Sequence, residues 1–272
     1  MLTDFAAVAA AAKVKAQREQ DEKLELAVRK LARHSSYGCV RLAHDGLDED
    51  TFSYIAVLLA EHERPLVRLD LDGNALADAG AMLVADVLQA KQSCTSLSLR
   101  DCAIGDAGLG AIAGVLGNHR GLRDLDVSAH VASADSVRAL ADAAAQSATL
   151  VRLTIGERAL DVQALRGADG ATRVALSGVS LGPTPDEMAL DGGSARVRLD
   201  DLIATCALLC ANARLQDLSL VGCGLSGAHA AAAIERVLAS CVRVRSLDLR
   251  RNRWEQGCAA QRPGARWHAC TR

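Results

Sequence analysis

The chain has few aromatic residues and no long apolar segment. Six of its 272 residues are Phe, Tyr or Trp, and four are Pro. A core with so few rings must be built from Leu, Val, Ile and Ala, which favours regular, closely packed elements. The uncharged run at residues 5–12 is too short to cross a membrane, and Asp4 lies where a secretory signal carries positive charge. We therefore expect a cytoplasmic protein that is neither secreted nor membrane-bound.

Charge and cysteine content argue against two further classes. A formal net charge of −2 provides no basic surface of the kind that nucleic-acid-binding proteins carry. Nine cysteines are an odd number in a chain too long to need disulfides, so we expect reduced, mostly buried thiols. Cys206 and Cys210 lie four residues apart, but no second Cys or His pair completes a metal site. We expect no metal, no cofactor and no nucleic-acid partner.

The main feature of the sequence is a repeat. Four segments align without gaps: "LVRLDLDGNAL" (66–76), "CTSLSLRDCAI" (94–104), "LRDLDVSAHVA" (122–132) and "LVRLTIGERAL" (150–160). Their central residues are spaced by 28: Leu69, Leu97, Leu125 and Leu153. Less regular copies place on the same columns Val40 and Leu42, Val179 and Leu181, Leu218 and Leu220, and Leu247 and Leu249. About eight repeats therefore span residues 37–252, with a surface loop inserted at 182–195.

Each repeat has two halves with different periods. Alternation in the first half, from Leu69 to Asp72, predicts a short strand with one buried face. In the second half, apolar residues recur at spacings of three and four, which predicts a helix: Leu76, Gly80, Leu83, Val84, Val87 and Leu88. One strand–helix unit cannot bury its apolar stripe alone, so it must stack on copies of itself. The pattern therefore predicts an α/β solenoid.

A turn column lies five residues after each central leucine. It holds Asn or Cys in four repeats, whose side chains can bond neighbouring backbone as the chain leaves the strand: Asn74, Cys102, Cys223 and Asn252. The other repeats place Asp45, His130, Arg158 and Thr184 there. We expect looser turns at His130 and Arg158.

Units of 28 or 29 residues that alternate Asn and Cys at this column resemble leucine-rich repeats of the ribonuclease-inhibitor type. Ran GTPase-activating proteins and NOD-like receptors have similar repeats. The resemblance covers roughly residues 37–252. It implies a horseshoe with one parallel sheet on the concave face and helices on the convex face.

The two ends fall outside the repeats. Residues 1–36 are rich in helix formers, and Leu24, Val28 and Leu31 fall on one helical face, so we expect an N-terminal helix that caps the first repeat. A free coiled-coil arm is the alternative. Residues 253–272 have no apolar period, and we expect an irregular tail. Either Trp254 and Trp267 fold over the end as a cap, or the chain is a fragment or carries an altered terminus.

Candidate binding residues come from the strand alternation, which points the side chains between the leucines at the concave face. They are Arg68, Asp70, Asp72, Ser98, Arg100, Asp124, Asp126, Arg152, Asp217, Asp248 and Arg250. The face has no aromatic residue, so arginines are its candidate anchors. Asp70, Asp72, Asp124 and Asp126 around Arg100 predict a cradle for a basic segment of a protein partner. The alternative is a merely solvated sheet face.

Catalysis is not expected on such a face. An open, shallow surface provides little of the desolvation that shifts a carboxyl pKa, and no phosphate loop, nucleophile elbow or His–Glu metal motif is present. We predict a non-enzymatic scaffold that binds a protein partner. A regulator of a small GTPase is one alternative, since the Ran GTPase-activating family uses an Arg and an Asn on rim loops. Asn74 with Arg68 or Arg100 is the nearest match, and we assign these residues no such role. A cytoskeletal or ciliary assembly component is a second alternative, by analogy.

Overall fold

Strands and helices alternate along the chain in a computed structural model that describes residues 19–130, 132–176, 193–252 and 266–268. The helices are α2 (Glu49–Glu61), α3 (Ala77–Ala90), α4 (Asp106–Leu116), α5 (Ala134–Gln146), α6 (Val162–Leu165), α8 (Gly193–Cys210) and α9 (Gly227–Ser240). The strands are β1 (Ser35–Ser36), β2 (Cys39–Arg41), β3 (Arg68–Asp70), β4 (Ser96–Ser98), β5 (Asp124–Asp126), β6 (Arg152–Thr154), β7 (Ala159–Asp161), β8 (Arg173–Ala175), β9 (Asp217–Ser219), β10 (Ser246–Asp248) and β11 (Arg266–His268).

The predicted register of the first five repeats is confirmed by the strand pairing. Strands β2 to β6 are parallel, and their central residues pair in the order Val40, Leu69, Leu97, Leu125 and Leu153. All five are buried, as is the next leucine column at Leu71 and Leu99. The 28-residue period thus stacks leucine on leucine to form one continuous core.

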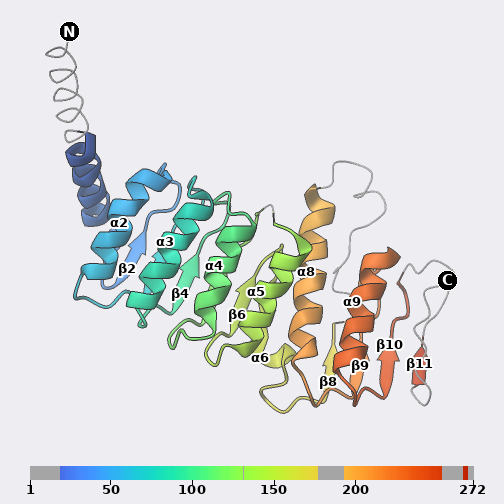
Figure 1. Ribbon diagram of the computed structural model, residues 1–272. Helices are drawn as coiled ribbons and strands as arrows, with labels where there is room; N and C mark the ends of the chain where they lie inside the picture. The colour runs from blue at the N-terminus through green and yellow to red at the C-terminus, as the bar shows by residue number, and fades with distance from the viewer. Residues whose placement is uncertain (1–18, 131, 177–192, 253–265, 269–272) are drawn as a thin grey trace, which may run out of the picture.

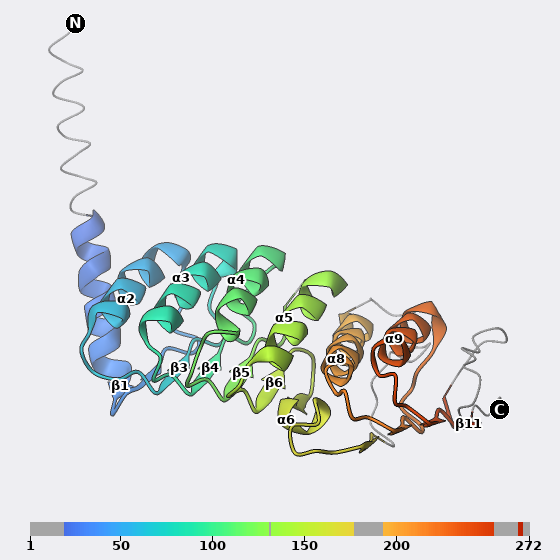
Figure 2. The same ribbon diagram turned by 60° about the horizontal axis from the view of Figure 1, so that its bottom comes forward.

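The helices lie side by side on one face of the strands (Figures 1 and 2). Contacts run in the order α2, α3, α4, α5, α8, α9. Gly108 of α4 illustrates how close the helices approach, because an added Cβ there would lie 2.9 Å from the Cβ of Ala81 on α3. The predicted α/β solenoid, with strands on one side and helices on the other, is confirmed.

The expectation of one continuous parallel sheet is wrong. The described strands form two sheets, β1 to β7 and β8 to β11. After β6 the chain reverses into β7, which pairs antiparallel with β6, and the helix that follows, α6, has only four residues. Helix α5 therefore packs directly against α8, and the helical layer continues across the place where the sheet is interrupted.

The register of the sixth repeat also differs from the prediction. Val174, not Val179, pairs with Leu218. Val179, Leu181 and Thr184 lie outside the described residues, as does most of the predicted loop at 182–195. Residues 193–195 belong to α8 instead of that loop.

The outer edge of β8 has no partner strand among the described residues. The carbonyl of Thr172 and the N–H of Leu176 bond to β9 and its preceding residues. Because alternate residues of a parallel strand face the same neighbour, the N–H and C=O groups of Arg173 and Ala175 point the other way.

Both ends of the chain differ from what the sequence predicts. The chain is helical at 19–34, and Ala27 is fully buried with Leu31 packed beside it. Leu24 and Val28, expected on the docking face, are 41% and 49% exposed. The C-terminal tail is not irregular throughout, because β11 adds to β10 with Trp267 opposite Leu247. The rest of 253–272 lies outside the described residues.

Candidate protein-binding face

The predicted concave face is the sheet face that the helices leave uncovered, and we call it the open sheet face (Figure 2). The strand register arranges its side chains in rows. One row contains Arg68, Ser96, Asp124 and Arg152, and the next contains Arg41, Asp70, Ser98, Asp126 and Thr154. Asp72, Arg100 and Ser128 follow just beyond the strands. Eight of the predicted site residues therefore share the first sheet, whereas Asp217, Asp248 and Arg250 lie on or beside the second.

Two aspartates on this face bond to the backbone where strands end. Asp72 Oδ1 accepts from the Ser98 hydroxyl at 2.5 Å and from the Arg100 N–H at 3.0 Å. Asp126 Oδ1 accepts from the N–H and hydroxyl of Ser128, at 3.0 and 2.7 Å. These carboxylates help to fix the turns, and each uses only Oδ1 in these bonds.

Two further aspartates pair with arginine. Arg152 Nε lies 2.6 Å from Asp124 Oδ1, and Arg68 lies 4.0 Å from Asp70. The hydrogen bond that Arg152 donates to Asp124 raises the pKa of the Arg152 guanidinium. The first sheet thus carries four aspartates facing four arginines: Arg41, Arg68, Arg100 and Arg152. The predicted cradle is consequently balanced in charge instead of acidic.

The second sheet repeats this pairing. Arg173 lies 3.2 Å from Asp217 across two strands, and Arg250 bonds Asp248 through Nε at 2.9 Å and Nη2 at 2.6 Å. Arg173 was missed by the sequence reasoning because the sixth repeat was aligned on Val179. The alternation in "TRVAL", residues 172–176, was the signal available.

Within each sheet, buried side chains of the turn column link neighbouring repeats by hydrogen bonds. Asn74 is buried, accepts from Leu47 N–H at 2.9 Å and donates to the carbonyls of Leu42 and Leu71. Asn252 accepts from Cys223 and Leu225 and donates to Leu220 and Leu249. Both the amide N–H groups and the oxygen of Asn74 therefore serve the turns, and Asn74 is buried instead of exposed at the rim.

His130 performs part of the same task, and the looser turn expected there stays a prediction. Its Nδ1 accepts from Ile104 N–H at 3.3 Å, in the position that the Asn74 oxygen occupies. Its Nε2 is buried without a hydrogen-bond partner. Burial lowers the pKa of the His130 imidazole. Arg158 contributes to no such contact and is exposed beside β7.

The cysteines of the described chain are free thiols. Burial raises the pKa of Cys94 and Cys102 to about 11 and that of Cys206 to about 12. Cys102 lies in the turn column with its Sγ 3.1 Å from the Leu71 carbonyl. Within the described ranges, no group of three or more His, Cys, Asp or Glu is arranged to hold a metal ion. Likewise, none of the described helices is long and apolar enough to span a membrane.

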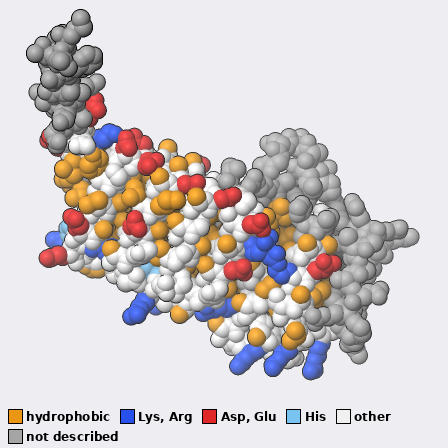
Figure 3. Space-filling model, viewed as in Figure 1, with side chains coloured by type: hydrophobic (Ala, Val, Ile, Leu, Met, Phe, Trp, Pro, Cys, Tyr) orange, Lys and Arg blue, Asp and Glu red, His pale blue; other side chains and the backbone are white. Residues whose placement is uncertain are grey.

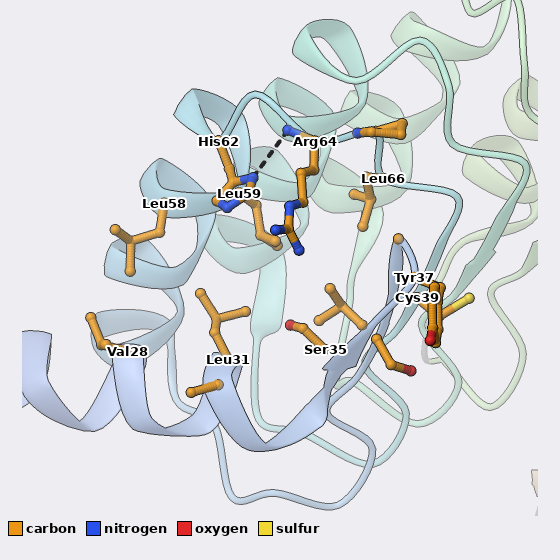
Figure 4. Close-up of a pocket in the computed structure, with 15 residues that line it drawn as sticks. Val28, Leu31, Ser35, Tyr37, Cys39, Leu58, Leu59, His62, Arg64 and Leu66 are labelled. Carbon is orange, nitrogen blue, oxygen red and sulfur yellow. Dashed lines mark hydrogen bonds between the residues drawn. The ribbon is translucent and has the colours of Figure 1, made fainter.

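A pocket of about 410 Å³ lies between the 19–34 helix and the first repeats (Figure 4). Val28 and Leu31 face Leu58 and Leu59 across it, and the Arg64 N–H bonds His62 Nδ1 at 3.1 Å at its mouth. The pocket is an apolar junction between two packed elements.

The fold is that of a repeat protein whose strands, in the described part of the chain, keep one face free of helices (Figure 2). Two segments, residues 62–85 and 92–113, match the family model described as "Leucine Rich repeat". These segments contain β3 with most of α3 and β4 with most of α4, so the match coincides with two of the most regular repeats. The architecture is that of an α/β leucine-rich repeat solenoid.

Among solved structures, the chain is similar to one titled "Leiomodin-1 Actin-Binding Site 2 (ABS2)". The identity is 22%, the TM-score is 0.40, and the alignment covers 50% of this chain and 78% of the other. A TM-score of this size says nothing about a shared partner. The comparison with curated proteins gives no match.

Proposed function

We propose that this protein is a non-enzymatic scaffold that binds a protein partner on the open sheet face of β2 to β6. One observation carries the proposal. The helices cover only one side of the strands, and the other side presents ordered rows of charged and polar side chains. An extended surface of this kind is what repeat solenoids use for binding.

The pairing of charges favours a partner of mixed charge over a purely basic one. The Arg100 guanidinium is exposed and makes no hydrogen bond or ion pair with the described residues, so it is available as an anchor for a partner carboxylate. Asp72 and Asp126 use only Oδ1 inside the described chain. Their Oδ2 atoms are available for donors from a basic side chain.

Absence of catalysis is part of the proposal and is supported by the same geometry. The carboxylates of the open sheet face are half-exposed, and an open surface does not provide the desolvation that prepares a carboxyl group for proton transfer. A GTP hydrolysis assay with Ran-like and related GTPases is expected to show no acceleration. Acceleration would favour the GTPase-regulator alternative.

Charge reversal tests the binding surface. Asp70→Lys/Asp124→Lys should lose the partners that proximity labelling detects for the wild type, because both carboxylates would become repulsive cations. The matched control is Asp86→Lys/Glu235→Lys, which makes the same charge change at exposed positions of α3 and α9. An unchanged partner set for the first variant, or equal losses for both, would remove the open sheet face as the binding site.

A further inference from the structure

The long helices of the solenoid all end on the same edge, because each repeat leaves its helix to begin the next strand (Figure 1). Exposed arginines lie in three of the connecting loops: Arg120 and Arg123 between α4 and β5, Arg214 between α8 and β9, and Arg243 and Arg245 between α9 and β10. We call these five residues the basic rim. Lys and Arg side chains project from this lower edge in Figure 3.

A structural role at helix ends does not account for these arginines. Arg166 shows what such a role looks like, because its Nη1 donates to the carbonyls of Ala145 and Ser147 at the end of α5. By contrast, the basic-rim guanidinium groups make no hydrogen bond and no ion pair with any described residue. Their charge still suits the negative ends of the helix dipoles, but it needs no direct contact to do so.

The basic rim also differs from the open sheet face in its lack of carboxylates. Arg152, Arg173 and Arg250 each pair with an aspartate on the sheet. Asp169, in the loop between α6 and β8, accepts a hydrogen bond from the Ala171 N–H and has no ion pair with a described residue. Arg64 is excluded from the rim because Glu61 and Glu63 accompany it in the same loop.

Three aspartates lie at the opposite edge. Asp78, Asp106 and Asp135 stand in the first turns of α3, α4 and α5, where they complement the positive helix ends. In a molecule with a net charge of −2, the five arginines of the basic rim thus lie on one edge, and these three aspartates lie on the other. Such a distribution orients an approaching anionic group toward that edge.

We propose that the basic rim binds an acidic polypeptide segment, independently of the open sheet face. Guanidinium groups match carboxylates in shape, as the Arg–Asp pairs of the sheet demonstrate within this same chain. A nucleic acid fits less well. The negative remainder of the molecule repels a dense polyanion. The rim loops at 117–123, 211–216 and 241–245 contain no Phe, Tyr or Trp on which a base could stack, and His119 is buried.

The test measures binding of a fluorescein-labelled peptide of ten Glu and Asp residues to the full chain, by anisotropy at low salt. The rim variant is Arg120→Glu/Arg123→Glu/Arg243→Glu/Arg245→Glu, and we expect it to bind at least about tenfold more weakly than the wild type. The corresponding Arg→Gln variant should weaken binding in the same direction. It guards against misfolding of the reversed protein, because it removes the positive charge without adding a negative one and keeps a polar side chain.

Arg68→Glu/Arg152→Glu on the open sheet face is the control, and it should keep the wild-type affinity within about twofold. The proposal fails if this control loses as much affinity as the rim variant, or if the Arg→Gln variant binds like the wild type. It also fails if single-stranded DNA of equal charge binds more tightly than the peptide. None of these outcomes depends on the partner of the open sheet face, so the two proposals can fail separately.

Discussion

The first four repeats and the fifth begin from similar strands but continue differently. In the first four, a strand is followed by a turn and by a helix of 11 to 14 residues. In the fifth, Leu153 keeps its place in the leucine ladder, yet the chain reverses into β7 and then forms only the four-residue helix α6. A leucine column therefore specifies a strand, whereas the turn and the helical stripe decide whether the strand becomes a complete repeat.

The residues after Leu153 explain the difference. Arg158 stands where Asn74 bonds the turn of the second repeat, and an exposed guanidinium cannot provide those internal bonds. Helix α6 ends before Gly167 and Gly170, both of which have positive φ. The helical layer remains continuous although the fifth repeat has no long helix, because α8 packs on α5.

The largest expected effect is the loss of a ladder leucine. Leu97→Ala should lower the free energy of unfolding by about 2–5 kcal/mol, because it opens a cavity at the centre of the stack. Arg158→Ala, in the irregular fifth repeat, should be nearly silent. Urea denaturation of both variants checks the contrast, and equal stabilities would contradict the registers described above.

The second-largest loss of stability should follow removal of a side-chain amide from the turn column. Asn74→Ala removes the side-chain partner of the Leu47 N–H and of the Leu42 carbonyl, and leaves the Leu71 carbonyl with the Cys102 thiol as its remaining side-chain donor, at a cost of about 1–3 kcal/mol. Asn118→Ala removes the same group at an exposed position and serves as the control. If the two variants unfold at the same urea concentration, the internal role of the turn column is wrong.

A buried carboxyl group beside the irregular repeat predicts a pH dependence. Asp201 on α8 accepts from Glu157 N–H at 3.1 Å, and burial raises its pKa to about 6. The folded state therefore binds the proton more tightly than the unfolded state, and stability falls as pH rises from about 4 to 6. Asp201→Asn should raise the melting temperature at pH 7, and the gain should vanish near pH 4. A gain that persists at pH 4 would assign the effect to packing instead of charge.

The smallest expected effect is a gain in stability from a more regular turn. His130→Asn should stabilise the fourth repeat by about 1 kcal/mol, because an amide can bond the carbonyls that the buried, unpartnered His130 Nε2 does not reach. His44→Asn, at an exposed turn, is the comparison. A destabilised His130→Asn protein would show that the imidazole ring packs better than the amide.

Much of the regular half could be predicted from the sequence, because a period of 28 fixes which leucines stack. The same period aligns Asp124 with Arg152, so that ion pair was also predictable. Strand β7 was not, since Ala159–Asp161 is too short to show a period. In the sixth repeat, Val179 and Leu181 have the same spacing as Val174 and Leu176, so the sequence alone did not show that the strand lies at Val174. The basic rim was missed because candidate binding residues were taken only from the strands, although Arg123 and Arg245 share one loop column and Arg214 and Arg243 share another.

Amide hydrogen exchange followed residue by residue tests the interruption of the sheet most directly. The N–H groups of Leu71, Leu99 and Val127 bond to the next strand and should exchange slowly. Within β8 and the residue after it, Leu176 should be protected by its bond to Ser219, whereas Arg173 and Ala175 should exchange fast. Protection of Ala175 equal to that of Leu176 would show that the strand ladder is continuous and would contradict the account.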